Sequence, residues 1–146
     1  MTTVKPIPDG YTAVTPYLIV ENAAGMLDFL VAAFGAVERL RVPMTGGGIG
    51  HAEVEIDGAA LMVSDTIPEY PTTSTHIHLY VTDVDAVYSR AIQAGATSDA
   101  APEDQFYGDR MARITDPHGN RWAIATHIKD LDPEEIMHHI AAMPDL

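Results

Sequence analysis

The sequence of 146 residues has no cysteine and no apolar run long enough to span a bilayer. Without cysteine there are no disulfides, thiolate nucleophiles or sulfur ligands for a metal, so any chemistry falls to histidine, carboxylate and hydroxyl groups. The first ten residues, MTTVKPIPDG, also lack the apolar segment of a signal peptide. These absences predict a cytoplasmic protein without a membrane partner.

Positive charge is scarce as well. Eight Lys and Arg residues stand against 21 Asp and Glu residues, which gives a net charge of −13. This balance argues against nucleic acid or an anionic membrane as a partner. A cationic small molecule would be attracted, although an acidic surface can also simply keep a protein soluble. Hydrophobic residues make up 47% of the chain, enough to bury a core.

The chain contains an internal repeat. TPYLIV, which starts at Thr15, is followed by a helical stretch that ends in FGA, and HIHLYV, which starts at His76, is followed by one that ends in AGA. The turn at Asp57-Gly58 recurs as His118-Gly119, and each landmark is displaced by 60 or 61 residues. This period is too long for a solenoid repeat and fits a complete supersecondary unit. Two such units predict a single domain.

The first unit, residues 12–66, reads as β-α-β-β-β. Residues 13–20 alternate as a strand, Asn22 can cap the following helix, and Gly35 can end it. Strands are expected at 37–43, 50–56 and 59–65, where Asp57-Gly58 is typical of a tight hairpin turn.

The second unit, residues 73–128, repeats this order. A strand at 75–81 precedes a helix with an apolar stripe, and strands follow near 97–103, 110–115 and 120–127. Asp132-Pro133 then predicts the start of a terminal helix over about 133–142. We expect this helix to pack on the chain's own sheet or on a partner subunit.

Three segments carry a resemblance to a known family: GHAEVEIDGAALMVSD, LYVTDVDAVYSRAIQAGA and QFYGDRMARITDPHGNRWAIATH. With the doubled βαβββ pattern, they resemble the vicinal-oxygen-chelate superfamily of glyoxalases, bleomycin-resistance proteins and extradiol dioxygenases, and most of all its PhnB-like branch. The resemblance covers about residues 11–128. It implies an α+β fold in which two tandem βαβββ units form a cup-shaped, barrel-like mixed sheet. It also implies a homodimer and a ligand in the cup, but the fold does not decide the chemistry.

The resemblance places the metal ligands of the catalytic families at four positions, which are Thr15, Met62, His76 and Ala123 in this sequence. Only His76 coordinates a divalent ion well, whereas a catalytic site needs about three protein ligands. The family metal site is therefore incomplete, with His76 its one candidate. His76 and His78 share a strand face and could chelate an ion together, with His127 as a third ligand only if it lies near His76.

Several side chains are candidates for contact with a ligand. If Trp122 and Ile124 face the helices, Arg121 and His127 face the cup, and the first strands of the two units turn aromatic and imidazole groups toward the same side. Phe106 and Tyr107 lie in a loop beside Gly108 that could cover the cavity mouth. The predicted ligand-binding residues are Tyr17, His76, His78, Tyr80, Phe106, Tyr107, Arg121 and His127.

Other groups leave alternatives open. His51, Glu53 and Glu55 share one face of their strand, which is either the cup lining with a general base or a solvated acidic face. The sequence identifies no catalytic residue. It favours a protein that binds and sequesters a small organic molecule without a cofactor. The alternatives are a divalent-metal-dependent lyase, isomerase or dioxygenase, and a metal-free enzyme that uses His or Glu.

Overall fold

The computed structural model describes residues 3–144. Both halves have the predicted order βαβββ. The elements are β1 (Tyr17–Val20), α1 (Ala23–Phe34), β2 (Val37–Pro43), β3 (Ile49–Ile56), β4 (Ala59–Asp65), β5 (His76–Tyr80), α2 (Val84–Gln93), β6 (Thr97–Asp104), β7 (Asp109–Thr115), β8 (Arg121–His127) and α3 (Pro133–Ala141).

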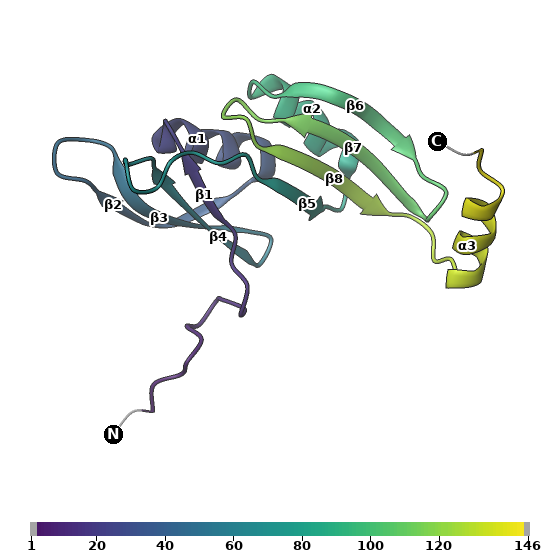
Figure 1. The fold of residues 1–146 in the computed structure, drawn as a ribbon, viewed down its shortest axis with the longest axis horizontal. Coiled ribbons are helices and arrows are strands. Elements are labelled where there is room, and N and C mark those ends of the chain that lie inside the picture. Colours follow the sequence, from purple (N-terminus) through teal and green to yellow (C-terminus); the bar gives the residue numbers. More distant parts are fainter. Residues whose placement is uncertain (1–2, 145–146) are drawn as a thin grey trace.

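Each half forms one four-stranded mixed sheet. The strand orders are β1-β4-β3-β2 and β5-β8-β7-β6, with β1 parallel to β4, β5 parallel to β8 and the other neighbours antiparallel. The two sheets lie side by side along the long axis; α1 packs on the N-terminal sheet, α2 on the C-terminal sheet, and the two helices pack on each other (Figure 1). The α+β prediction is confirmed. Within one chain, however, the sheets stay open and do not close into a barrel.

Local sequence explains where the elements begin and turn. The Asn22 side chain accepts a hydrogen bond from the Gly25 amide at 3.0 Å and caps α1. Gly35 ends α1 with a φ of 68°. The β3–β4 hairpin turns through Asp57 and Gly58, with φ values of 46° and 89°, as a type I′ turn requires.

The first strand is shorter than predicted. Residues 13–20 were expected to be extended, but β1 begins only at Tyr17. Pro16 has no amide hydrogen and cannot donate to a strand ladder, although its carbonyl accepts a bond from the Met62 amide at 3.0 Å. The pairing therefore starts one residue after the proline.

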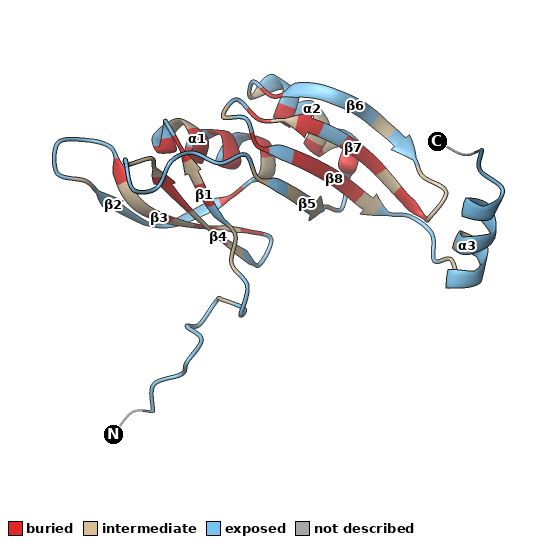
Figure 2. Cartoon of the chain, viewed as in Figure 1, coloured by how far each residue is buried: buried red, intermediate tan, exposed pale blue. Residues whose placement is uncertain are grey.

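One core joins the helices to both sheets. Trp122 is its largest fully buried side chain and lies 4.7 Å from Phe34, measured between ring centroids. The indole Nε1 donates to the buried Asp116 at 2.9 Å. Figure 2 shows burial concentrated in α1, α2 and the central strands, whereas β2, β6 and α3 are largely exposed. The sheet faces turned away from the helices are thus left for other contacts.

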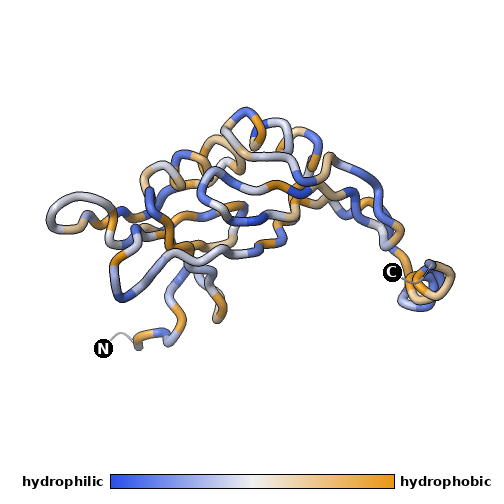
Figure 3. The backbone as a smooth tube through the Cα atoms, turned by 45° about the horizontal axis from the view of Figure 1, so that its top comes forward, coloured by the Kyte–Doolittle hydropathy of each residue, from blue (hydrophilic) through white to orange (hydrophobic). Residues whose placement is uncertain are grey.

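Helix α3 does not pack on either sheet. Asp132 caps it by accepting a bond from the Glu135 amide at 2.9 Å, as the sequence predicted. It contains no buried residue, and it lies at one end of the molecule, away from both sheets (Figures 1 and 3). Packing of α3 on the chain's own sheet, one of the two alternatives, is therefore not found. No helix within residues 3–144 is long and apolar enough to cross a bilayer.

Candidate functional site

The open face of the C-terminal sheet carries most of the predicted ligand-binding residues. Trp122 and Ile124 are buried in the helix-side core, so the alternate residues of β8 point the other way. Strand pairing places His78 beside Ala123 and Tyr80 beside Ala125 on this same face. Ala123 and Ala125 are buried and form a floor, whereas His76, His78, Tyr80, Arg121 and His127 are exposed above it.

At one end of this face, four side chains form a hydrogen-bonded chain. Tyr80 donates its phenol hydrogen to Asp109 Oδ2 at 2.8 Å, and His127 Nδ1 contacts Asp109 Oδ1 at 2.7 Å. His127 Nε2 contacts Asp130 at 2.7 Å. Ionised carboxylates only accept, so this arrangement is satisfied when both ring nitrogens donate, as they do in the protonated imidazole. The ring of His78 lies 4.8 Å from that of Tyr80 and completes the cluster.

The pKa values of these groups are shifted as this geometry requires. The hydrogen bonds to Asp109 and then to Asp130 raise the pKa of His127. Burial works against ionisation of Asp109, but the bonds from His127 and Tyr80 outweigh it and hold its pKa below the ordinary value. The bond to Asp109 also raises the pKa of Tyr80. Both oxygens of Asp109 and both nitrogens of His127 are engaged, so this cluster orients groups and offers no free base.

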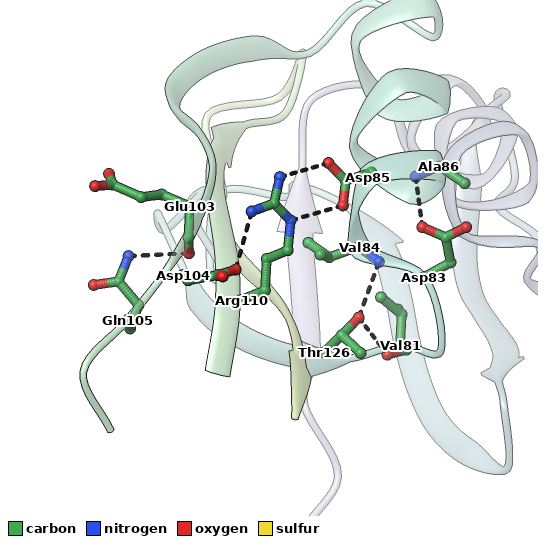
Figure 4. Close-up of polar contacts among 10 residues, drawn as sticks. All are labelled: Val81, Asp83, Val84, Asp85, Ala86, Glu103, Asp104, Gln105, Arg110 and Thr126. Atoms are coloured by element: carbon green, nitrogen blue, oxygen red, sulfur yellow. Dashed lines mark hydrogen bonds and ion pairs between the residues drawn. The ribbon is translucent and has the colours of Figure 1, made fainter. Parts of the chain in front are cut away.

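Structural contacts beside this cluster fix its position. Arg110, next to Asp109, reaches Asp85 on α2 with two bonds of 2.8 and 2.9 Å and Asp104 on β6 with one of 3.0 Å (Figure 4). Thr126, next to His127, donates to the Val81 carbonyl and accepts from the Val84 amide, each at 2.9 Å. These contacts tie β7 and β8 to the start of α2.

The opposite end of the same face is basic. His76 pairs with Arg121 across β5 and β8, and both line a hollow of about 180 Å³ with Arg113 and Asp99. His127 lies six residues farther along β8 than Arg121, roughly 20 Å away at the usual strand rise. The predicted residues His76 and His127 are thus on one face but at opposite ends, which contradicts the idea that they share an ion.

The N-terminal sheet has an open face too. Ala52, Val54 and Ile56 are buried in the core, so His51, Glu53 and Glu55 line the open side, which settles the question that periodicity left open. Tyr17 Oη lies 2.9 Å from His51 Nδ1. Tyr11 donates to Glu53; burial, followed by this bond, raises the pKa of Tyr11 to about 12. Glu55 is paired with Arg39.

Beside Tyr17 lies an apolar hollow of about 350 Å³ that sequence reasoning missed, apart from Tyr17 itself. Ile67 and Tyr70 enter it from the linker between the halves, where their backbones pair with each other. The β1 alternation from Tyr17 to Ile19 could have indicated one wall, but no local signal marks the linker residues. The hollow is lined by Tyr17, Ile19, Met44, Gly50, Ser64, Asp65, Ile67 and Tyr70.

The aromatic side chains of the loop, Phe106 and Tyr107, contact different parts of the structure. Tyr107 packs on the small cluster of Met111, Ala123 and Ala125, and its hydroxyl lies 3.6 Å from the Met111 sulfur. It therefore covers part of the C-terminal sheet face. Phe106 instead stacks on His139 of α3, with ring centroids 4.4 Å apart and planes at 5°. That stack is a link between the loop and the terminal helix.

The residues present do not fit the metal site implied by the family. Strand pairing puts Met62 beside Tyr17 and Ala123 beside His78, so the counted positions do lie on the open faces. Their side chains, however, are a thioether and a methyl group, which do not hold a divalent ion of the kind that prefers nitrogen and oxygen. Across residues 3–144, no three His, Asp or Glu side chains are grouped in a way that could bind a metal.

Comparison with known proteins defines the class to which this architecture belongs. Over residues 10–124 the chain matches the model of the Glyoxalase/Bleomycin resistance protein/Dioxygenase superfamily, and it is a member of that superfamily. The resemblance seen in the sequence is thereby confirmed at this level. The protein Mb0911c of Mycobacterium bovis is 40% identical over 144 residues, which cover 91% of this chain and 95% of the relative.

Solved structures share the fold. TioX from Micromonospora sp. ML1 is 28% identical with a TM-score of 0.70, and the match covers 80% of this chain and 99% of TioX. TnmS3 from Streptomyces sp. CB03234, described as an antibiotic binding protein, is 25% identical with a TM-score of 0.63; that match covers 80% of this chain and 99% of TnmS3.

Proposed function

We propose that this protein binds and sequesters a small organic molecule on its open sheet faces, without metal catalysis. The observation that carries the proposal is the hollow of about 350 Å³ beside Tyr17, a size typical of small-molecule sites. Its walls are aromatic and aliphatic, and the Ser64 hydroxyl is a polar group at its edge. Asp65 is held by the amides of Ala23 and Ile49 at 2.8 and 2.7 Å, so that edge is rigid.

The related structures support a binding role. TnmS3 has the same fold and binds an antibiotic, by its description. The four family positions of this chain do not form a metal ligand set. Binding a ligand does not need such a set, whereas the metal-dependent catalysis of the family does. The net charge of −13 is compatible with a cationic ligand. We also propose that the protein belongs to the PhnB-like branch, which several of its segments resemble, and that it is cytoplasmic.

We further propose that the protein works as a homodimer. In the single chain Tyr17, Tyr70 and Tyr80 are 40%, 63% and 56% exposed, and the two sheet faces remain open. A second copy that packs on these faces would remove apolar and aromatic surface from water and enclose the hollows. The exposed helix α3 is available for the same contact.

A fragment screen tests the binding role. Small aromatic compounds are titrated into ¹⁵N-labelled protein, and amide shifts report where they bind. We expect shifts at β1, β4 and residues 67–70, and weaker binding in Ile19→Ala, with Val31→Ala on the outer side of α1 as the control. Shifts spread over the outer helix surfaces, with equal affinity in both variants, would contradict the proposal.

A second candidate, a divalent-metal-dependent lyase, isomerase or dioxygenase, is favoured by one observation. His76 and His78 are exposed on the same face of β5 and could chelate an ion together. The remaining ligands would have to come from outside this sheet face. Metal analysis separates the two functions. Stoichiometric divalent metal in purified protein, lost in His76→Ala, would favour the enzyme; much less than one ion per chain would favour binding.

A further inference from the structure

The chain concentrates positive charge at one point, against its overall charge of −13. Arg113 and Arg121 lie on neighbouring strands of the C-terminal sheet, and both line the hollow of about 180 Å³ with His76. Arg121 pairs with Thr115 and Arg113 with Ala123, so the arginines are diagonal neighbours on one face, with Cα atoms about 7–8 Å apart by sheet geometry. Their guanidinium groups can therefore reach a common anion, which would offset the repulsion between two like charges.

These arginines also lack the carboxylate partners that three of the other four arginines have. Arg39, Arg41 and Arg110 each form an ion pair with a carboxylate. Within the described chain, residues 3–144, Arg113 and Arg121 form none. One carboxylate, Asp99, lines the hollow, but it accepts the Thr115 hydroxyl at 2.7 Å and is outnumbered by the two guanidinium groups.

The equivalent place in the other half has the opposite charge. A displacement of 60 residues maps Arg113 of β7 onto Glu53 of β3, and Glu53 lies on the open face with Glu55. The basic character therefore belongs to the C-terminal sheet alone and is not a property of the repeated fold. It is a local feature of this site.

We propose that His76, Arg113 and Arg121 bind the anionic group, a carboxylate or a phosphate, of the small organic ligand. The inference rests on the proposed function and gives it a ligand class: a molecule with an anionic group, in place of the cationic ligand that the net charge of −13 alone would attract. It concerns the hollow of the C-terminal sheet, which shares no lining residue with the hollow beside Tyr17. Guanidinium groups bind carboxylate and phosphate oxygens with paired, charge-assisted hydrogen bonds, and the His76 imidazole supplies a further N–H. Contact at this range outweighs the screened field of distant carboxylates.

The test uses three matched probes, benzoate, benzamide and benzylamine, together with inorganic phosphate. Each is titrated into ¹⁵N-labelled full-length protein, with the variants Arg113→Gln, Arg121→Gln and the double variant. Arg90→Gln is the control, because Arg90 is exposed on α2 and lines a different hollow. We expect benzoate to bind more tightly than benzamide and benzylamine, with shifts at β5, β7 and β8. Its affinity should fall about tenfold in the double variant and fall with added salt, whereas the control should change nothing.

The outcomes separate the two proposals. Phosphate that competes with benzoate assigns the site to both anions, and benzoate alone assigns it to carboxylates; both results support the inference. Equal binding of the three aromatic probes, unchanged in the double variant, overturns the anion site and leaves small-molecule binding intact. A double variant that dissociates a dimer but keeps its affinity for benzoate also overturns it, since the arginines would then act at the interface between two copies of the chain.

Discussion

The Nδ1 atom of His127 lies 2.7 Å from Oδ1 of Asp109, a carboxylate that is only 3% exposed. This contact lies at one end of the C-terminal sheet face, where Tyr80 donates a hydrogen bond to the other oxygen of Asp109. The opposite end has arginines without carboxylate partners. The face therefore has a rigid, internally satisfied end and an end whose charges are available to a ligand.

The first prediction concerns pH. The folded-state pKa of His127 is raised above its ordinary 6.5, so its contribution to stability is fully present below about pH 6.5 and is lost as the pH rises through the raised value. That of Asp109 is lowered below 3.8, so its contribution is present above about pH 4 and is lost as the pH falls through the lowered value. The pair thus stabilises the fold most between about pH 4 and 6.5.

His127→Gln should therefore lower the Tm most in that window and least near pH 9, as measured by thermal melts from pH 4 to 9. A nuclear magnetic resonance titration of the ring gives the direct check. His138, which is exposed on α3, is the control, and a His127 ring that titrates at or below pH 6.5 would count against the ion pair.

The second prediction concerns the turn before β8. Asp116 is buried and accepts bonds from the amides of His118 and Asn120 and from Trp122 Nε1, at 2.8, 3.1 and 2.9 Å. Asp116→Ala leaves three donors, two of them buried, without a partner and should cost about 3 kcal/mol in the free energy of unfolding. Urea denaturation followed by the fluorescence of Trp122, the single tryptophan, measures it.

Asp99→Ala is the matched control for this change. Asp99 is exposed and accepts only the Thr115 hydroxyl, so its removal should have a much smaller effect. Equal losses in the two variants would show that the Asp116 contacts do not hold the turn.

The third prediction concerns Arg110 and its two carboxylate partners. The bonds to Asp85 and Asp104 raise the pKa of Arg110, and the bond from Arg110 lowers that of Asp85. The pairs are partly exposed, so Arg110→Gln should lower the Tm only slightly at low salt. In 1 M NaCl the difference from the unmodified protein should nearly vanish. A large loss that salt does not reduce would mean that the side chain acts through packing instead.

The fourth prediction concerns assembly. Light scattering at micromolar concentration should give about twice the chain mass of 15.7 kDa, because the open faces need a second copy to cover them. Truncation after residue 131 tests whether α3 takes part. If the protein is a monomer at all concentrations, a second copy does not cover the open sheet faces.

Local signals in the sequence predicted most of the fold. Asn22, Gly35 and Asp57-Gly58 mark a cap, a helix end and a turn whose geometry depends on those residue types, and each lies where it was expected. The orientation of β8 was conditional on Trp122 and Ile124 facing the helices, and in the structure both are buried in the core on that side. Alternation then placed Arg121 and His127 on the open face.

The site was less predictable because it depends on contacts between distant residues. Ile67 and Tyr70 belong to an irregular linker, and only the folded chain shows that they border the hollow beside Tyr17. The alternation at residues 13–16 resembled a strand, but Pro16 cannot donate to the ladder. The separation of His76 from His127 depends on strand register, which single-strand patterns do not specify.

The central claim is that an organic ligand binds to the open sheet faces without a metal. The most direct measurement is the affinity of an aromatic fragment for EDTA-treated protein, compared with protein supplied with Ni, Zn or Mn, in the unmodified chain and in His76→Ala. The account predicts equal affinity with and without metal, and no rise in Tm on addition of metal. Binding that requires metal and disappears in His76→Ala would contradict it.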